Sequence, residues 1–524
     1  MARYSYERLS AQDAAFLFAE RPNEPMHVGA VAIFDGGTTS SDLDGVDIEK
    51  FRQTVEGVLH WIPRYRQKLE WTPLESWPIW VDDRQFDIGH HIRHIALPRP
   101  GSFEQLTELV GRINSRPLDR RHPLWEIWVI EGVAEGSQFA LLNKIHHCMI
   151  DGAGGADLSQ ILLSPSPKSE IGAPMPFMPR PIPRRSELVR DSLSRGIRRS
   201  LDLVKDSSRR STSTSDRSVG LGDRFRAIRE VLRYAIRPAC DTPINGSLGP
   251  HRRFEWLAMP LDDVRELRKV LGCTINDVVL ATVAGAMRRY LFRRRVDHRM
   301  IDFRIAAPVS TRQPGHDHRH GNHVSTWIVP LPLELEDPLE RLEAITETTR
   351  QLKDSKAELA LDTLMEVAEW LPTPLLAIGT RAAQAPAHMV VTNVHGPQFP
   401  LYIMGSRLLG MYPIVPLLPG SGLGVALFSY EGKLCWGFNG DSELVPDLGL
   451  FVEDIGAAFE ELRGAAVKNF MDRRTAAPES DSNESTSVEG AGGAMKASDL
   501  LIDPCPSPVE PVERLGEQAV HASG

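Results

Sequence analysis

Hydrophobic and polar residues alternate along residues 1–165 in short runs that predict strands and helices in turn. The apolar run Val28–Phe34 is closed by Asp35, Gly36 and Gly37, which is typical of a strand followed by a turn. The same reasoning predicts the other elements of this region: an amphipathic helix at 47–59, strands at 125–131 and 139–145, and a helix at 152–163. Strands mixed with helices predict a layered α/β or α+β domain.

A second folded region is predicted further along the chain. It opens with a helical pattern, after which runs rich in apolar residues recur between polar segments and predict further strands. The expected elements are a helix at 223–236 and strands at 303–307, 327–331, 389–392, 424–428 and 433–438. We therefore expect four parts: an N-terminal domain at 1–165, a Pro/Ser linker with a basic helix at 166–220, a C-terminal domain at 221–470, and a disordered acidic tail at 471–524.

The composition is that of an ordinary globular protein, with 524 residues, 42% hydrophobic and 25% charged. No apolar stretch approaches about 20 residues, so no membrane-spanning helix is expected. The N-terminus lacks the apolar run of a secretory signal. The five cysteines are scattered without a CxxC pair, which argues against disulfides and a structural zinc site and favours a cytoplasmic location.

The net charge of -9 is concentrated in the tail, because residues 471–524 hold ten acidic and four basic side chains. The rest of the chain is nearly neutral, which argues against a nucleic-acid-binding protein. Residues 184–210 are the exception, with nine Lys/Arg and four Asp/Glu. Apolar residues recur in this segment at helical spacing: Val189, Leu193, Ile197, Leu201 and Val204. Such a helix either rests on the protein body as a solvated connection or lies on a membrane or lipid-droplet surface.

The clearest chemical signature is the sequence HHxxxDG at residues 146–152, between a predicted strand and a predicted helix. If the strand continues to His147, alternation turns His147 to the face of Ile145 and His146 to the face of Lys144. Two such histidines cannot readily share one metal ion, so we expect one working and one structural histidine. A free imidazole has a pKa of about 6.5, which suits proton abstraction near neutral pH. Asp151 could cap the next helix, pair with a cation or orient the imidazole, and the alternative is that both histidines are ordinary core or edge residues.

These residues belong to a set of motifs that resembles the bacterial wax ester synthase/diacylglycerol acyltransferase family, in the CoA-dependent acyltransferase superfamily. His146, His147, Asp151 and Gly152 match the superfamily signature. Other segments resemble the family in order along about residues 5–465: Leu9–Phe16, Pro25–Gly29, Pro123–Trp125 (PLW), Asn276–Ala281 (NDVVLA), Pro308–Ser310 with Arg312, and Gly321–Asn322. Two positions depart from the family pattern, His395 where Pro is usual and Cys148 where Ala is common.

The resemblance implies a mixed α/β (α+β) fold with two chloramphenicol-acetyltransferase-like domains, each a mixed sheet flanked by helices. A solvent tunnel between the domains would admit acyl-CoA at one end and a lipid alcohol at the other. Residues 1–165 would supply HHxxxDG, and residues 221–465 would supply the opposing wall. Residues carried over to the tunnel are Pro123, Leu124, Trp125, Asp277 and Arg312.

The implied reaction is transfer of a long-chain acyl group from acyl-CoA to diacylglycerol, giving triacylglycerol, with fatty alcohols as further acceptors that give wax esters. His147 would be the general base and His146 a supporting residue. Asp151, beside Gly152, would be structural and pair with Arg312, and Asn276 would stabilise the oxyanion or support the site. No metal or cofactor is required. The alternatives are a polyketide or glycolipid acceptor, and a lipid- or acyl-CoA-binding homologue without catalysis.

Several of these residues have a second interpretation. Cys148 could be a nucleophile, but a small buried side chain is the preferred interpretation because free cysteines are usually buried and inert. The PLW residues could serve ordinary packing. Asn276 and Asp277 could cap a helix at 278–287. The tract of His316, His318, His320 and His323 could bind a metal, although its neighbours are typical of an exposed loop.

Overall fold

A computed structural model describes residues 6–36, 45–150, 158–168, 172–195, 241–310, 324–354 and 387–476. The chain divides into two compact units, Met1–Arg463 and Gly464–Gly524. The first unit contains the described sheets, and the described residues of the second unit form the last part of helix α13 (Leu448–Ala476). Residues 471–476, predicted as the start of the disordered tail, instead continue helix α13, whose helical hydrogen bonding runs past the predicted boundary. The predicted helix at 223–236 and the rest of the predicted tail, 477–524, lie outside the described residues.

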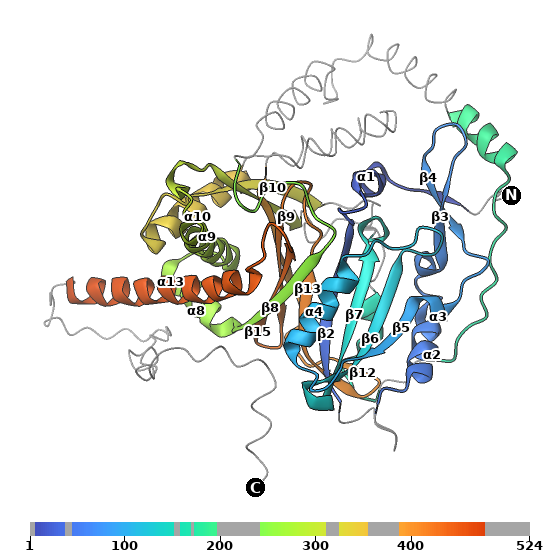
Figure 1. Cartoon of the computed structure of the whole chain (residues 1–524), viewed down its shortest axis with the longest axis horizontal. Coiled ribbons are helices and arrows are strands. Elements are labelled where there is room, and N and C mark those ends of the chain that lie inside the picture. The colour runs from blue at the N-terminus through green and yellow to red at the C-terminus, as the bar shows by residue number, and fades with distance from the viewer. Residues whose placement is uncertain are drawn as a thin grey trace, which may run out of the picture. The chain divides into compact units, whose positions relative to one another are not determined.

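The first six-stranded sheet carries the candidate site (Figure 1). Its strands, in spatial order, are β12 (Tyr402–Ile403), β13 (Ser406–Ile414), β2 (His27–Asp35), β7 (Gln138–His146), β6 (Trp125–Val133) and β5 (Ile92–Ala96). The predicted strands at 28–34, 125–131 and 139–145 are confirmed. The sheet is mixed, because β5 runs parallel to β6 while β7 is antiparallel to both β2 and β6.

Strand β13 comes from the second half of the chain but pairs with β2 of the first half, with Tyr412 opposite Val31. The sequence pattern did not predict this strand, because Arg407 and Pro413 interrupt its apolar residues. Its alternate side chains are nevertheless buried, as a half-covered strand requires. Sheet pairing therefore joins residues 402–414 to the N-terminal half across the predicted domain boundary.

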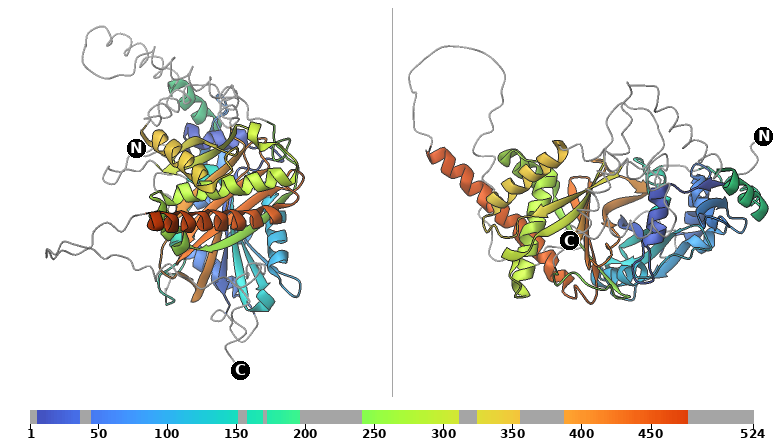
Figure 2. Two further views of the ribbon diagram at one scale, coloured as in Figure 1. Left: turned by 90° about the vertical axis from the view of Figure 1, so that its left-hand side faces the viewer. Right: turned by 90° about the horizontal axis from the view of Figure 1, so that it is seen from above.

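The second six-stranded sheet contains all five strands predicted for the C-terminal region. In spatial order its strands are β10 (Val324–Leu331), β9 (Phe303–Ser310), β11 (Met389–His395), β14 (Leu423–Tyr430), β15 (Lys433–Asp441) and β8 (Arg252–Pro260). Strand β8 was not predicted, since its charged residues obscure the alternation of apolar positions. Helices α8 (Leu261–Leu271), α9 (Ile275–Arg293) and α10 (Pro338–Asp354) lie against this sheet (Figures 1 and 2).

Several further elements come from the N-terminal half of the chain. The predicted helix at 47–59 is confirmed as α2 (Ile48–Val58), which begins where the Asp47 side chain accepts a hydrogen bond from the Lys50 amide. The remaining elements are α1 (Ala11–Ala19), α3 (Ile88–His91), α4 (Phe103–Asn114), α5 (Leu158–Leu162), and the small sheet of β1 (Glu7–Arg8), β4 (Pro78–Asp82) and β3 (Gln67–Trp71), which the sequence analysis did not predict.

A polar seam joins the two large sheets through helix α4 and strand β8. A Cβ atom at Gly111 of α4 would lie 2.6 Å from the carbonyl oxygen of Arg252, so only glycine permits this approach. The side-chain amide nitrogen of Asn114 donates to Asn439 Oδ1 at 3.1 Å, and Ser115 Oγ accepts from the backbone amide of Arg252 at 2.9 Å. These bonds pair groups that would otherwise be buried unsatisfied, which fixes one sheet against the other.

Judged by length and composition, none of the described helices could cross a membrane alone. Taken as one segment, α8 and α9 would meet the length and composition criteria for a membrane-spanning helix, but the two helices are bent by 100° relative to each other.

Candidate active site

The two histidines stand where strand β7 turns into the short 3-10 helix η3 (His147–Met149). The His146 amide donates to the Leu124 carbonyl at 2.9 Å, and the His147 amide donates to the Met26 carbonyl at 2.8 Å. Cys148 then donates its amide to His146 Nδ1 at 3.2 Å. The strand therefore ends at His146, one residue before the continuation to His147 that the alternation argument assumed, because the His146 ring bonds the turning backbone.

The surroundings of His146 are those of a buried structural residue. Its side chain is 1% exposed and lies on the sheet face of Lys144, as predicted. Lys144 Nζ donates to the carbonyls of Ile113, at 3.0 Å, and Arg116 at the C-terminal end of α4, where a cation is favoured by the helix dipole. Burial lowers the pKa of Lys144 to about 8. His146 Nε2 lies 3.5 Å from Glu20 Oε1.

His147 is partly buried and stacks on Phe16 of α1, with ring centroids 3.7 Å apart and planes inclined by 16°. Its Nδ1 is buried and has no hydrogen-bond partner among the described residues. Burial lowers the pKa of the imidazole to about 4, since little water is present to solvate the charged form. The ring is therefore neutral at pH 7 and can accept a proton.

Cys148 has the character of a packing residue. Its side chain is 2% exposed, and burial raises the pKa of the thiol well above its usual range. A thiol in this state supplies little thiolate, the nucleophilic form. The interpretation of Cys148 as a small buried side chain is confirmed. Cys273 and Cys435 are also free thiols.

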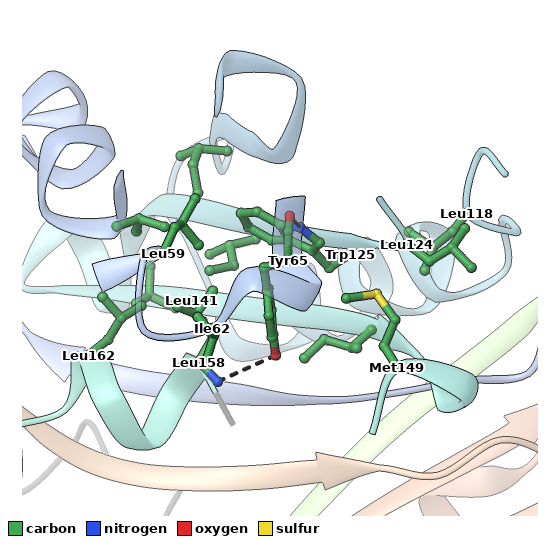
Figure 3. Packing of buried hydrophobic residues seen from close by; sticks show 14 of the residues in the cluster. Leu59, Ile62, Tyr65, Leu118, Leu124, Trp125, Leu141, Met149, Leu158 and Leu162 are labelled. Carbon is green, nitrogen blue, oxygen red and sulfur yellow. Dashed lines mark hydrogen bonds between the residues drawn. The ribbon is translucent and has the colours of Figure 1, made fainter. Parts of the chain in front are cut away.

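The PLW residues lie in the apolar core beneath β7. Leu124 and Trp125 are 0% and 1% exposed, and Trp125 Nε1 donates to the Tyr65 carbonyl at 2.8 Å. Figure 3 shows Trp125 and Tyr65 packed together, with the Tyr65 hydroxyl accepting from the Leu158 amide at 3.4 Å. Packing is therefore their observed role, and a role for Pro123, Leu124 and Trp125 in a substrate tunnel stays a prediction.

Helix α9 begins near the predicted NDVVLA motif and confirms the helix expected at 278–287. Thr274, rather than Asn276, is its cap: Thr274 Oγ1 accepts from the Asp277 amide, and Asp277 Oδ2 accepts from the Thr274 amide at 2.9 Å. Asp277 is buried, and its Oδ1 accepts from Thr349 Oγ1 at 2.7 Å. These contacts give Asp277 a structural role. Asn276 is half-buried in the first turn of α9, and its role in stabilising the oxyanion or supporting the site stays a prediction.

Several predicted site residues lie outside the described residues: Asp151, Gly152, Arg312 and the histidine tract at 316–323. Of the helix predicted at 152–163, the described part is α5, Leu158–Leu162. Across the parts of the chain that the structure describes, no three His, Cys, Asp or Glu side chains are grouped to hold a metal ion.

Three side chains near the histidines were not singled out from the sequence: Phe16, Glu20 and Arg120. Phe16 is the last residue of the family-like segment Leu9–Phe16, and Glu20 lies between that segment and Pro25–Gly29. The family motifs therefore contain Phe16 and flank Glu20. No periodicity marks Arg120, which comes from the loop before β6. Only the folded chain shows that these residues converge on His146 and His147.

A narrow crevice, too small to be called a cavity, lies at the seam between the sheets, lined by His27 and Asn114 from the N-terminal half and by Arg252 and Asn439 from the C-terminal half. His27 is 2% exposed, and burial lowers the pKa of its imidazole well below the usual range. His27 faces His146 across the β2–β7 pair. The crevice is polar and does not include His147, so the predicted acyl-CoA tunnel stays a prediction.

Comparison with known proteins agrees with the motifs. Residues 9–279 match the wax ester synthase/diacylglycerol acyltransferase catalytic domain, and residues 320–463 match the WS/DGAT C-terminal domain. The chain is 34% identical over 480 residues to the probable diacylglycerol O-acyltransferase tgs1 of Mycobacterium tuberculosis H37Rv, which covers 90% of this chain and 98% of that protein.

Solved structures show the same fold. The wax ester synthase/diacylglycerol acyltransferase from Marinobacter aquaeolei VT8 superposes with a TM-score of 0.62 at 25% identity, covering 88% of this chain and 100% of that chain. The TRI3 trichothecene 15-O-acetyltransferase from Fusarium sporotrichioides gives a TM-score of 0.56 at 12% identity, covering 87% and 95%. The second similarity concerns the fold alone.

Proposed function

The chain belongs to the wax ester synthase/diacylglycerol acyltransferase family, and from this premise we propose that it transfers a long-chain acyl group from acyl-CoA to diacylglycerol. The product is triacylglycerol, and fatty alcohols are a second acceptor class that gives wax esters. The observation that carries the proposal is the position of the His147 imidazole, stacked on Phe16 at the end of β7 within the matched catalytic domain. Burial, which lowers the pKa of this ring to about 4, supports the same role.

In the proposed reaction His147 acts as the general base. As the acceptor hydroxyl oxygen attacks the thioester carbonyl carbon, its proton passes to Nε2 of the neutral ring. The tetrahedral oxyanion then collapses, the C–S bond breaks, and the imidazolium returns the proton to the departing CoA thiolate. The ester and free CoA are the products, and no metal or cofactor enters a step. The raised pKa of the Cys148 thiol supports direct transfer over an acyl-enzyme.

An acceptor panel tests this function with the purified full chain and one long-chain acyl-CoA. We expect diacylglycerol to give the highest kcat/KM, with activity on a fatty alcohol. A glycolipid or polyketide alcohol that exceeds diacylglycerol by about tenfold, or about 1.4 kcal/mol of transition-state preference, would overturn the acceptor assignment. Tight acyl-CoA binding without turnover on any acceptor would instead identify a non-catalytic homologue.

We also propose peripheral contact between residues 184–210 and an anionic lipid surface facing the cytoplasm. Residues 185–195 are helical. Leu188, which is 5% exposed, packs on Ile79 and Val81 of β4, whereas Leu193 is 57% exposed. Ile197, Leu201 and Val204 of the predicted stripe lie outside the described residues. Leu188 rather than that stripe thus anchors the described helix, and deleting 184–210 would also uncover β4.

Charge reversal is therefore the better test of this contact. The variant Arg185→Glu with Arg190→Glu should weaken binding to vesicles that contain phosphatidylserine by about tenfold or more, since each basic residue near such a surface contributes about 1 kcal/mol. Vesicle co-sedimentation measures the effect. The matched control reverses Arg268 and Lys269, two exposed cations of α8, and should bind as the wild type does. Equal binding by both variants would remove this segment from the membrane contact.

A further inference from the structure

The Glu20 side chain contacts three separate segments of the chain, at Met26, Arg120 and His146, which meet beside the candidate base His147. It directly follows α1, and its side chain is 7% exposed. Oε1 accepts from the Met26 amide at 3.1 Å and lies 3.5 Å from His146 Nε2. Oε2 accepts from Arg120 at 3.2 Å from Nε and 2.6 Å from Nη2. A carboxylate this well covered is retained only where partners compensate for its lost hydration.

The hydrogen bonds of His146 identify its tautomer. Its Nδ1 accepts the Cys148 amide proton, so Nδ1 carries no proton and the neutral ring must carry its hydrogen on Nε2. Nε2 is the atom that faces Glu20. Although burial acts to raise the pKa of Glu20, the imidazole of His146 and the guanidinium of Arg120 bring it down to about 2. The group beside Nε2 is therefore a carboxylate, which accepts a proton and donates none.

The same contacts hold the end of helix α1. Arg120 Nη2 also donates to the Leu17 carbonyl at 3.1 Å, one residue beyond Phe16, whose ring stacks on His147. Arg120 and Glu20 thus tie down the helix that supplies the stacking ring, and His146 ties down the turn that supplies the imidazole. Both sides of the Phe16–His147 stack depend on one carboxylate.

We propose that Glu20 is a positioning residue for acyl transfer, holding the Nε2–H edge of His146 and the end of α1 in place so that the His147 ring keeps its reactive orientation. This inference rests on the proposed role of His147 as the base. Other charged or titratable groups around the cluster are His27 on β2, Lys144 on β7, Asp13 on α1 and Arg120 in the loop before β6.

Two substitutions separate positioning from mere stability. Glu20→Gln keeps one oxygen, which can accept from the Met26 amide and lie beside His146 Nε2, but turns an NH2 group toward Arg120. Glu20→Ala removes both oxygens. We expect Glu20→Ala to lower kcat by about 10- to 100-fold, because a displacement of about 1 Å can cost 100-fold. The KM for acyl-CoA should stay within about threefold, since no substrate contact is removed. Glu20→Gln should retain kcat within about fivefold. The matched control is Asp119→Ala, a carboxylate in the same loop as Arg120 that pairs with Arg121 at 2.6 Å and should leave kcat unchanged.

A spectroscopic measurement reads the tautomer without any turnover. In protein labelled with 15N-histidine, the His146 ring should show a protonated Nε2 and an unprotonated Nδ1 in the wild type. The Nε2 signal should shift in Glu20→Ala, because the carboxylate beside it is lost, and should shift less in Glu20→Gln. The His146 signals are assigned by their absence in His146→Gln. The thermal midpoint of each variant shows whether the fold is kept.

The possible results are distinct. Unchanged kcat in Glu20→Ala, or equal loss in Glu20→Gln with the His146 Nε2 signal unshifted in both, would overturn the inference. If His147→Ala lost activity while Glu20→Ala did not, only the inference would fail and the proposed function would stand. If the wild type transferred no acyl group at all, the proposed function would fail, and a His146 Nε2 signal that did not shift in Glu20→Ala would then reject the positioning role by itself.

Discussion

Replacement of His147 by alanine is expected to lower kcat for acyl transfer to diacylglycerol by about 100- to 10,000-fold, the range of a positioned general base. The reason is chemical: a hydroxyl is a weak nucleophile at pH 7, and this ring is neutral because burial lowers its pKa to about 4. Steady-state rates with labelled acyl-CoA measure the loss. A kcat within about threefold of the wild type would falsify the assignment of the base.

The control for this variant is His90→Ala. His90 is also a partly buried histidine, and its ring packs on His122 with centroids 3.8 Å apart and planes inclined by 32°, so its removal has a comparable packing effect. It belongs to α3 and not to the β7–η3 turn, and its replacement should keep the wild-type kcat. Loss of activity in both variants would indicate a general destabilisation instead of lost proton transfer.

The pH profile of the wild type gives a second check on the same residue. Its pKa in the folded protein, about 4, lies below the value of about 6.5 for a free histidine. The base therefore stays unprotonated from pH 8 down to about 5, and its protonation should reduce kcat/KM only as the pH falls through about 4. Protonation also favours unfolding in the window from about 6.5 to 4, so the fold must be monitored in parallel. An acid limb at pH 6 to 7 would contradict a buried base.

Substitution of Asp441 by alanine is expected to destabilise the protein by about 3 to 5 kcal/mol, the usual effect of removing one partner from a buried ion pair. Asp441 Oδ2 lies 3.0 Å from Arg252 Nη1, with the two side chains 0% and 2% exposed. Oδ2 also accepts from the Gly249 amide at 2.8 Å. Arg252 in turn donates to the Asn23 carbonyl of the N-terminal half. The substitution removes the nearer countercharge of the guanidinium at the seam between the sheets and leaves Glu24 as the other acidic group acting on it.

Chemical denaturation measures this effect as a shift of the unfolding midpoint. The matched control is Glu336→Ala, which breaks the pair with Arg299 at 2.7 Å, where both side chains are largely exposed. Water and salt screen that pair, so no measurable change is expected. An Asp441→Ala midpoint equal to that of the control would show that the buried pair does not hold the seam.

Much of the local structure followed from the sequence because its causes are local. Short runs of apolar, aromatic and β-branched residues predicted β2, β6 and β7, and Asp47 marked the start of α2. Helix α9 was predicted as well, but its cap was assigned to Asn276 and Asp277. The structure shows a reciprocal pair of hydrogen bonds between Thr274 and Asp277, which depends on the backbone angles at Thr274 and not on residue type alone.

The sequence by itself determined the family, the mixed α/β architecture and the adjacent histidines at the end of an apolar strand, since these depend on residue order and short-range periodicity. Only the tertiary structure decided that β13 completes the first sheet, because every strand offers the same backbone donors and acceptors and a sequence does not name its partner. It alone brought Glu20, Arg120 and Phe16 to the histidines. Contacts between residues far apart in the chain arise from packing of the whole unit, which no local pattern records.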